Sequence, residues 1–308
     1  MMPLSFLSRR VQTNCLQSNY SRYQSDEVIA QYCDAHYGPD KLGVGNFSRQ
    51  IAQRCFEHLE AGQQQSALVL GCAVGRTAFE LATRFRQVTG VDFSSRFIDI
   101  ANRLKKTGRL HYKLINEGEL LTDHGICLAD FKLDKTADRV TFRQSDAQDL
   151  EPTLTGYDLV VAANLIDRLP DPGSFLSGIH ERIAVNGVLL LASPNDWQEK
   201  YTPKKKWLGG YFRNGRAVKS YEQLQKKLAK HFESVNEPID IEFTLRKTAR
   251  TFSHGISQVT VWRKRGYAEA VNKIVKKYTL IVYPIGAGEL DFSLISVFIE
   301  PFRALCVL

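Results

Sequence analysis

The stretch Ala67-Leu-Val-Leu-Gly71-Cys-Ala-Val-Gly75-Arg-Thr-Ala-Phe-Glu80 decides the fold of this chain. Its short apolar run breaks at two glycines and continues as a helical pattern over 77–84, which is typical of a buried parallel strand that passes into a helix. A glycine has no Cβ, so the backbone can turn sharply and come close to a ligand. The stretch predicts a loop for a nucleotide-like ligand, although tight turns with two glycines also occur where nothing binds.

A second apolar strand, Gln87–Asp92, follows this helix and ends in a carboxylate 17 residues after Gly75. An acid about 20 residues beyond such a turn binds ribose hydroxyls, because a carboxylate accepts two hydrogen bonds from a diol. Asp92 could instead cap the helix that starts at Ser94 or Ser95, and the two roles are compatible.

The remaining strands follow in alternation with helices. We expect a helix over Ser94–Lys106, a polar and apolar insertion over 111–138, and strands at Val140–Arg143, Tyr157–Ala163 and Gly187–Ser193. This order predicts an α/β, doubly wound parallel sheet. Ligands of such sheets bind outside the carboxyl ends of the strands, where the glycine loop, Asp92, Asp146 and Asn164 fall.

Two helices precede the first strand, one capped by Ser25 and one over Asn46–Leu59, with a break at Gly38–Gly45. We expect them to form a helical cap over the carboxyl edge of the sheet. Residues 1–18 are interpreted as a disordered lead-in. The first 25 residues contain Arg9, Arg10 and Arg22 and no acidic residue, so an organellar transit peptide is the alternative.

Beyond Pro194 the pattern becomes irregular. The loop Asp196–Gly210 carries two tryptophans and is either a pocket wall or a packed surface loop. A helix over Ser220–His231 and two β-rich runs, Ile239–Thr248 and Gln258–Arg263, follow; a turn around Ser253–Gly255 would join the runs as an antiparallel edge hairpin. The extension 264–308 is too interrupted for a membrane-spanning helix, and its role is open.

Composition points to a globular protein. Of the 308 residues 44% are hydrophobic, and 41 basic against 33 acidic residues give a net charge of +8. The charges are interspersed, which favours a solvated surface over a nucleic-acid site. Six cysteines without metal-ligand spacing indicate reduced thiols and a cytoplasmic location, and no metal site is expected.

Several separated stretches carry a family resemblance between residues 19 and 263. They are Tyr32–Gly38, Asn46-Phe47, Gly71–Arg76, Glu117–Leu120, Ala162–Arg168, Trp207–Gly210, Arg250–His254 and Ser257–Arg263. With these stretches the chain resembles the class I S-adenosylmethionine-dependent methyltransferases, and among them the methyltransferase domain of ovothiol-synthesis enzymes, the 4-mercaptohistidine N1-methyltransferases. The resemblance implies a Rossmann-like, mostly parallel sheet with an antiparallel edge hairpin, a helical cap over 19–62, and the sheet core with its substrate loops over 63–263.

The resemblance implies a site for S-adenosylmethionine. Gly71, Cys72, Ala73, Gly75 and Arg76 would lie at the methionyl part, Asp92 at the ribose, Phe93 and Ala147 at the adenine, Asp146 at its amino group, and Asn164 where cofactor and substrate meet. Asp146 could instead cap a helix. The chain departs from the family at Val69, where an acid is usual, and at Ser48 and Gln50, where the family's Asn-Phe-Pro motif and following arginine are altered.

The implied reaction is methylation of an imidazole nitrogen of 5-thiohistidine. Positioning and desolvation would carry the catalysis, and the pocket must hold the more nucleophilic sulfur away from the methyl group. Arg168 would pair with the substrate carboxylate, and Asp167 would bind its amino group or a ring proton, unless the two form a surface ion pair. Further candidates for substrate contact are Asn164, Tyr20, Tyr23, Trp207 and His254, the last of which could merely cap a turn.

The chain contains no stretch that resembles the sulfoxide synthase of the larger ovothiol enzymes, so we expect another protein to supply the thiohistidine. The sequence leaves open an acceptor of another kind, including RNA. It also leaves open a non-catalytic binding protein that keeps the fold, which Val69 and Gln50 favour slightly.

Overall fold

The computed structural model describes residues 23 and 25–266. The expected lead-in 1–18 and nearly all of the extension 264–308 lie outside this range. The described residues up to Arg265 belong to one compact unit. Within the described range no helix is both long enough and apolar enough to cross a membrane.

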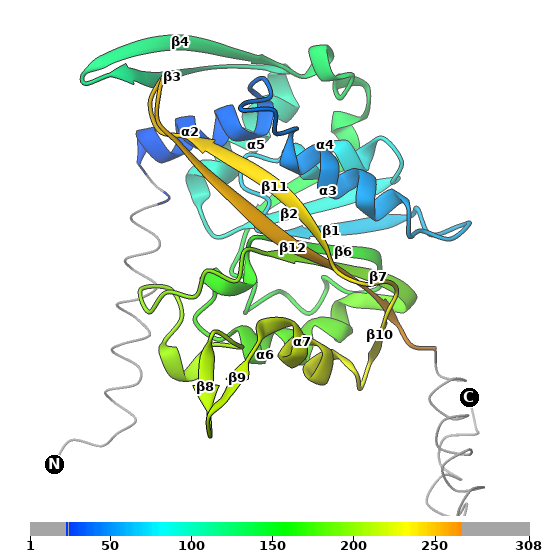
Figure 1. Ribbon diagram of the computed structural model, residues 1–308. Helices are drawn as coiled ribbons and strands as arrows, with labels where there is room; N and C mark the ends of the chain where they lie inside the picture. The colour runs from blue at the N-terminus through cyan, green and yellow to red at the C-terminus, as the bar shows by residue number, and fades with distance from the viewer. Residues whose placement is uncertain (1–22, 24, 267–308) are drawn as a thin grey trace, which may run out of the picture. The chain divides into compact units, whose positions relative to one another are not determined.

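A central sheet carries the fold (Figure 1). Its strands run in the order β10 (Phe232–Ser234), β12 (Phe252–Lys264), β7 (Ile183–Ser193), β6 (Tyr157–Ala163), β1 (Ser66–Leu70), β2 (Gln87–Asp92) and β5 (Val140–Gln144), and β11 (Ile239–Arg246) also pairs with β12. The pairs among β1, β2, β5, β6 and β7 are parallel, whereas β12 is antiparallel to its three neighbours. The predicted doubly wound sheet with an antiparallel edge is confirmed.

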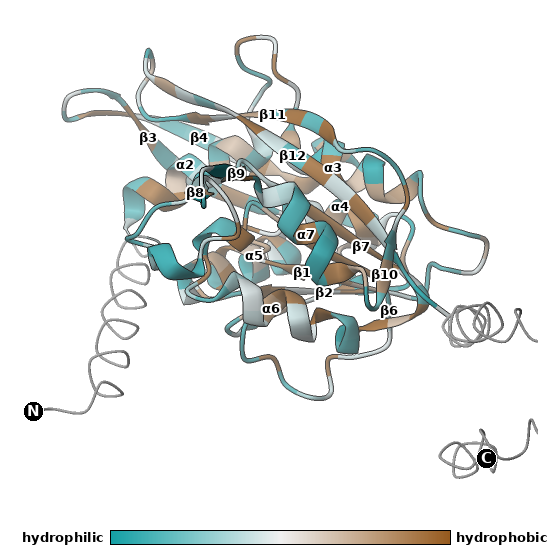
Figure 2. Ribbon diagram, turned by 60° about the horizontal axis from the view of Figure 1, so that its bottom comes forward, coloured by the Kyte–Doolittle hydropathy of each residue, from teal (hydrophilic) through white to brown (hydrophobic). Residues whose placement is uncertain are grey.

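Helices cover both faces of this sheet, as Figure 1 shows. On one face lie α2 (Asp26–Tyr37), α3 (Phe47–Phe56), α4 (Arg76–Ala82) and α5 (Ser95–Thr107); on the other lie α6 (Pro172–Gly178) and α7 (Ser220–Leu228). Side chains alternate along a strand, so Ala67 and Val69 pack with the first set and Leu68 and Leu70 with the second. Figure 2 shows the hydrophobic strands inside and hydrophilic helix surfaces outside.

Helix starts follow the local sequence closely. The side chains of Ser25, Asn46 and Ser94 cap α2, α3 and α5 by accepting hydrogen bonds from backbone N–H groups three residues on. Each cap satisfies a donor that the first helical turn leaves without a partner. The predicted helix over 220–231 is shorter, because it ends at Leu228 and residues 229–231 form a turn that leads into β10.

Two short hairpins were not predicted from the sequence. The insertion 111–138 contains a separate antiparallel hairpin of β3 (Arg109–Glu117) and β4 (Leu120–Cys127). The remaining short elements are β8 (Tyr211–Arg213) and β9 (Arg216–Val218), which form a hairpin, and the 3-10 helices η1 (Leu128–Phe131), η2 (Asp134–Arg139), η3 (Ile166–Arg168), η4 (Ile179–Arg182) and η5 (Lys204–Lys206).

The turn of the edge hairpin was predicted at the wrong place. It lies at 247–251, where Thr248 Oγ1 accepts hydrogen bonds from the N–H groups of Arg250 and Thr251. His254 and Gly255 are inside β12, opposite Thr244 and Phe243. A Cβ at position 255 would come within 2.4 Å of the Phe243 ring, so this glycine serves close packing rather than a turn.

Candidate functional site

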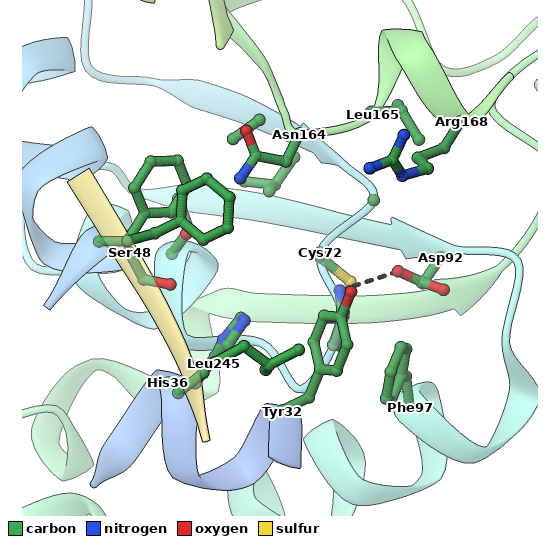
Figure 3. Close-up of a pocket in the computed structure, with 18 of the residues that line it drawn as sticks. Tyr32, His36, Ser48, Cys72, Asp92, Phe97, Asn164, Leu165, Arg168 and Leu245 are labelled. Atoms are coloured by element: carbon green, nitrogen blue, oxygen red, sulfur yellow. Dashed lines mark hydrogen bonds between the residues drawn. The ribbon is translucent and has the colours of Figure 1, made fainter. Parts of the chain in front are cut away.

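A cavity of about 260 Å³ lies at the carboxyl ends of the parallel strands. Four strand ends form its floor, with lining residues 69–73 at the end of β1, 91–94 at the end of β2, 145–147 just after β5 and 163–165 at the end of β6. The cap helices α2 and α3, the loop between them and residues 243–245 of β11 close it. In Figure 3, Asn164 and Arg168 lie on one side, and Tyr32, His36 and Leu245 on the other.

The glycine loop turns through three residues with positive φ. Gly71 has φ +70°, Ala73 +46° and Gly75 +89°. A Cβ on Gly75 would meet the Phe142 ring at 2.6 Å, so both the backbone conformation and the packing call for glycine there. The N–H of Cys72 donates to the Val91 carbonyl at 2.9 Å, which ties the loop to the end of β2.

Asp92 lies beside this loop at the end of β2. Its Oδ2 accepts a hydrogen bond from the Ala73 N–H at 2.8 Å, the bond drawn in Figure 3, and its Oδ1 accepts one from the Ser94 N–H at 2.9 Å. Burial raises the pKa of the carboxyl to about 6, although these backbone donors oppose the shift. Since Ser94 caps α5, Asp92 is left to face the cavity.

The residues predicted at the adenine also line the cavity. They are Phe93, which is 38% exposed, Asp146 and Ala147. Asp146 Oδ1 accepts a hydrogen bond from the Gln148 N–H at 2.8 Å, so this carboxylate also stabilises a turn. This role is similar to the helix-capping alternative considered from the sequence. The loop with its positive φ angles, the carboxylate at β2 and the aromatic ring beside it fit an adenosyl ligand.

Asn164 and Arg168 reach the cavity from the end of β6. Asn164 has φ +53°, and its Oδ1 accepts a hydrogen bond from the Ser257 hydroxyl at 2.7 Å. The Arg168 guanidinium donates to Asp167 Oδ2 at 3.1 Å and to Asp196 Oδ2 at 3.2 Å. A substrate carboxylate at Arg168 would therefore compete with two carboxylates of the chain itself.

Other predicted residues lie outside the cavity lining. Asp167 is fully buried and bonds to Arg168 and to the Asp196 N–H, so it supports Arg168 rather than facing the cavity. Trp207 donates to the Thr202 carbonyl, which matches the packed-loop alternative. His254 pairs with Glu242 at 3.1 Å on the hairpin surface.

Arg76 also lies outside the lining, beneath the cap. It pairs with Glu80 at 2.7 Å and donates to the carbonyl oxygen of His36 at 3.2 Å. Tyr23 lines the cavity, and Tyr20 is outside the described residues.

Several lining residues carry no role in the sequence-based prediction. The cap supplies His36, Asn46 and Phe47, and β11 supplies Phe243 and Leu245. No local pattern marks them, because they meet only when the chain folds: the Phe47 and Phe243 rings lie 5.7 Å apart although 196 residues separate them in the sequence. Ser48, noted only as a departure from the family, is buried at the same wall.

Comparisons with known proteins agree with this geometry. A family model described as a methyltransferase domain matches residues 47–233. The structure of the [4+2]-cyclase SpnF is similar, with a TM-score of 0.51, 14% sequence identity, and coverage of 81% of this chain and 97% of that one, which supports the fold alone. No curated protein sequence matches the chain significantly.

Two further structures show weaker likeness. The N-methyltransferase NodS from Bradyrhizobium japonicum WM9, in complex with S-adenosyl-L-homocysteine, has 17% identity, a TM-score of 0.47, and coverage of 82% of this chain and 100% of that one. Magnesium protoporphyrin IX methyltransferase (ChlM) from Synechocystis PCC 6803, with bound S-adenosylmethionine, has 13% identity, a TM-score of 0.48, and coverage of 82% and 97%. Since the family model spans more than half of its length, this chain belongs to the methyltransferase domain family and is an S-adenosylmethionine-dependent methyltransferase.

Proposed function

We propose that this methyltransferase transfers the methyl group of S-adenosylmethionine to an imidazole nitrogen of 5-thiohistidine and so forms ovothiol. The family resemblance of the stretches between residues 19 and 263 supports this acceptor. The observation that carries the proposal is the continuity of the cavity, which runs from Asp92 at the cofactor end to a chamber walled by Phe47, Phe243 and Leu245. A chamber of this kind suits a small flat ring.

The cofactor end has a donor or acceptor for each part of an adenosyl ligand. When bound, S-adenosylmethionine supplies an electrophilic methyl group on a sulfonium sulfur. Asp92 accepts hydrogen bonds from the ribose hydroxyls, Asp146 accepts one from the adenine amino group, and Phe93 packs against the ring. Val69 is buried in the lining where the family has an acid, so the methionyl ammonium must rely on backbone carbonyls and Asn164.

The acceptor end works by positioning and by excluding water. The Phe47 and Phe243 rings are tilted by 60° to each other and offer an apolar face to an imidazole. Removing water from the acceptor nitrogen raises its reactivity, and a fixed approach to the methyl group supplies much of the rate. The aromatic ring of Tyr23 and the guanidinium of Arg168 line the same cavity and can contact the amino-acid part of the acceptor.

An acceptor assay tests the proposal. The purified chain is incubated with S-adenosylmethionine and, in separate reactions, 5-thiohistidine, histidine and RNA, and products are separated by liquid chromatography and mass spectrometry. We expect methylated thiohistidine as the main product. Methylation of RNA or of no imidazole, by a chain that binds S-adenosylmethionine in calorimetry, would refute the acceptor, and absence of binding would favour a non-catalytic protein. The histidine reaction tests whether another protein must supply the thiohistidine, since this chain should then form no methylated thiohistidine from histidine.

A further inference from the structure

His36 is a cavity-lining residue without an assigned role. It lies in the last turn of α2, and two donors hold its carbonyl oxygen: Asn46 Nδ2 at 2.9 Å and Arg76 Nη1 at 3.2 Å. These bonds come from α3's cap residue and from α4, so the residue is fixed by elements on two sides. In Figure 3 its imidazole projects from α2 toward the interior of the cavity.

The two ring nitrogens of His36 have different surroundings. Nδ1 is sealed from solvent and has no hydrogen-bond partner among the described residues. Nε2 is not sealed in this way, and no described residue bonds to it, so it is the nitrogen that reaches the cavity. Buried polar atoms without a partner are rare in folded proteins and call for an explanation.

The imidazole is uncharged at neutral pH. Burial lowers the pKa of His36 to about 3, and the neighbouring Arg76 guanidinium adds to the shift. A neutral imidazole carries one N–H donor and one lone pair. Because no described residue accepts a hydrogen bond from Nδ1, the proton is better placed on Nε2, where a ligand can accept the hydrogen bond. His36 then presents a neutral N–H group to the cavity.

The transfer itself needs no base from the protein. In the thiolate form of thiohistidine, the lone pair of a ring nitrogen forms the new bond to the methyl carbon, and the carbon–sulfur bond of the sulfonium breaks with its electrons left on sulfur. The products are S-adenosylhomocysteine and a ring that carries a thiolate and an imidazolium, so charge balances without loss of a proton. The difficulty is selectivity, because the thiolate is the stronger nucleophile.

We propose that His36 determines which atom is methylated: its Nε2–H donates a hydrogen bond to the acceptor's sulfur and holds that sulfur away from the methyl group. This inference rests on the proposed function, since it assumes an acceptor with an anionic sulfur beside a ring nitrogen. A hydrogen bond to an ionised atom is stronger than one between neutral groups, and it also lowers the nucleophilicity of the sulfur.

The test compares H36L, which removes the donor, with H36Q, whose amide can donate from a similar distance. H111L serves as the matched control, because His111 is exposed on β3 and outside the cavity lining. Binding of S-adenosylhomocysteine is measured by calorimetry, and the N-methyl and S-methyl products of 5-thiohistidine are separated and quantified.

We expect all variants to bind S-adenosylhomocysteine within about twofold of the wild type. H36L should form the N-methyl product about tenfold more slowly and raise the S-methyl fraction about fivefold or more, with H36Q between H36L and wild type and H111L unchanged. If H36L loses cofactor binding, H36Q is compared with H36N instead. The shorter amide of H36N cannot reach the position of Nε2, so only H36N should raise the S-methyl fraction.

Two results overturn the inference in different ways. An unchanged ratio of N-methyl to S-methyl product in H36L, or in H36N where that comparison is used, refutes the role of His36 and leaves the proposed function intact. A wild-type chain that binds the cofactor but methylates thiohistidine at neither atom refutes the proposed function and this inference together.

Discussion

Replacing Asp92 by alanine should weaken cofactor binding strongly while the sheet stays intact. The carboxylate holds the loop through the Ala73 and Ser94 N–H groups and faces the cavity with its remaining lone pairs. A hydrogen bond to a charged group contributes about 1.5–3 kcal/mol, and two ribose hydroxyls sharing one carboxylate contribute less than twice that. We expect a loss of about 3 kcal/mol, or about a hundredfold in the dissociation constant of S-adenosylhomocysteine, measured by calorimetry.

Asp158→Ala provides the matched control. Asp158 also accepts two backbone hydrogen bonds, from the N–H groups of Gln65 at 2.8 Å and Ser66 at 3.1 Å, but at the opposite edge of the sheet. It should lose stability in thermal unfolding and keep cofactor affinity. A loss below about fivefold in Asp92→Ala, or equal losses in both variants, would show that Asp92 does not hold the cofactor.

The raised pKa of Asp92 also predicts how cofactor affinity depends on pH. In the unliganded protein this pKa is raised to about 6, and only the ionised carboxylate accepts from both ribose hydroxyls. Affinity should therefore be full above pH 6 and fall as the pH drops below it, by up to about tenfold per unit, because binding then releases a proton. Asp158→Ala should keep this pH dependence, and Asp92→Ala should lack it.

Three further substitutions probe the scaffold of the site. Gly75→Ala should lower the free energy of unfolding by about 2–3 kcal/mol, measured by denaturant titration. Gly62 has the same φ of +89° but no described atom near the position of a Cβ, so Gly62→Ala should show only the backbone share of about 1–2 kcal/mol. Equal losses in the two variants would rule out a clash with Phe142. Arg76→Met should lower the free energy of unfolding by about 3 kcal/mol because it leaves Glu80 unpaired, and adding Glu80→Gln should recover part of that loss. A loss in thermal unfolding no larger than that for an exposed ion pair would contradict this reasoning. His254→Ala should leave turnover within about twofold, since its partner is the half-exposed Glu242, and a tenfold loss would return His254 to the substrate site.

The cofactor half of the site could be predicted because short, continuous segments of the sequence form it. A parallel strand, two glycines and a helix start lie within fourteen residues, and the acids at Asp92 and Asp146 follow directly after strands that periodicity identifies. The carboxyl ends of neighbouring parallel strands meet at one edge of the sheet, so local assignments alone bring these residues together. The register confirms it, with Leu70 opposite both Val91 and Ala162.

The acceptor half could not be predicted in this way. The polar side chains of Asp167 and His254 and the aromatic loop residue Trp207 suggested substrate contacts, but the direction of each side chain depends on packing. Asp167 turns inward to Arg168, the Trp207 indole bonds within its own loop, and His254 faces Glu242 across the hairpin. The edge hairpin shows the same limit. Gly255 lies in a short polar run with the composition of a turn, yet it is inside β12, where the Phe243 ring on the paired strand β11 leaves no room for a Cβ.

The two halves of the cavity are therefore built by different kinds of contact. The cofactor half rests on backbone geometry within the sheet, while the acceptor half is formed where the cap meets β11, through Phe47 against Phe243 and the lining residue Leu245. Side chains where the cap meets β11 can change without disturbing the glycine loop or Asp92, because no backbone hydrogen bond between the strands depends on them. We therefore propose that packing between the cap and the edge hairpin sets the choice of acceptor, with His36 placed at that junction by Asn46 and Arg76.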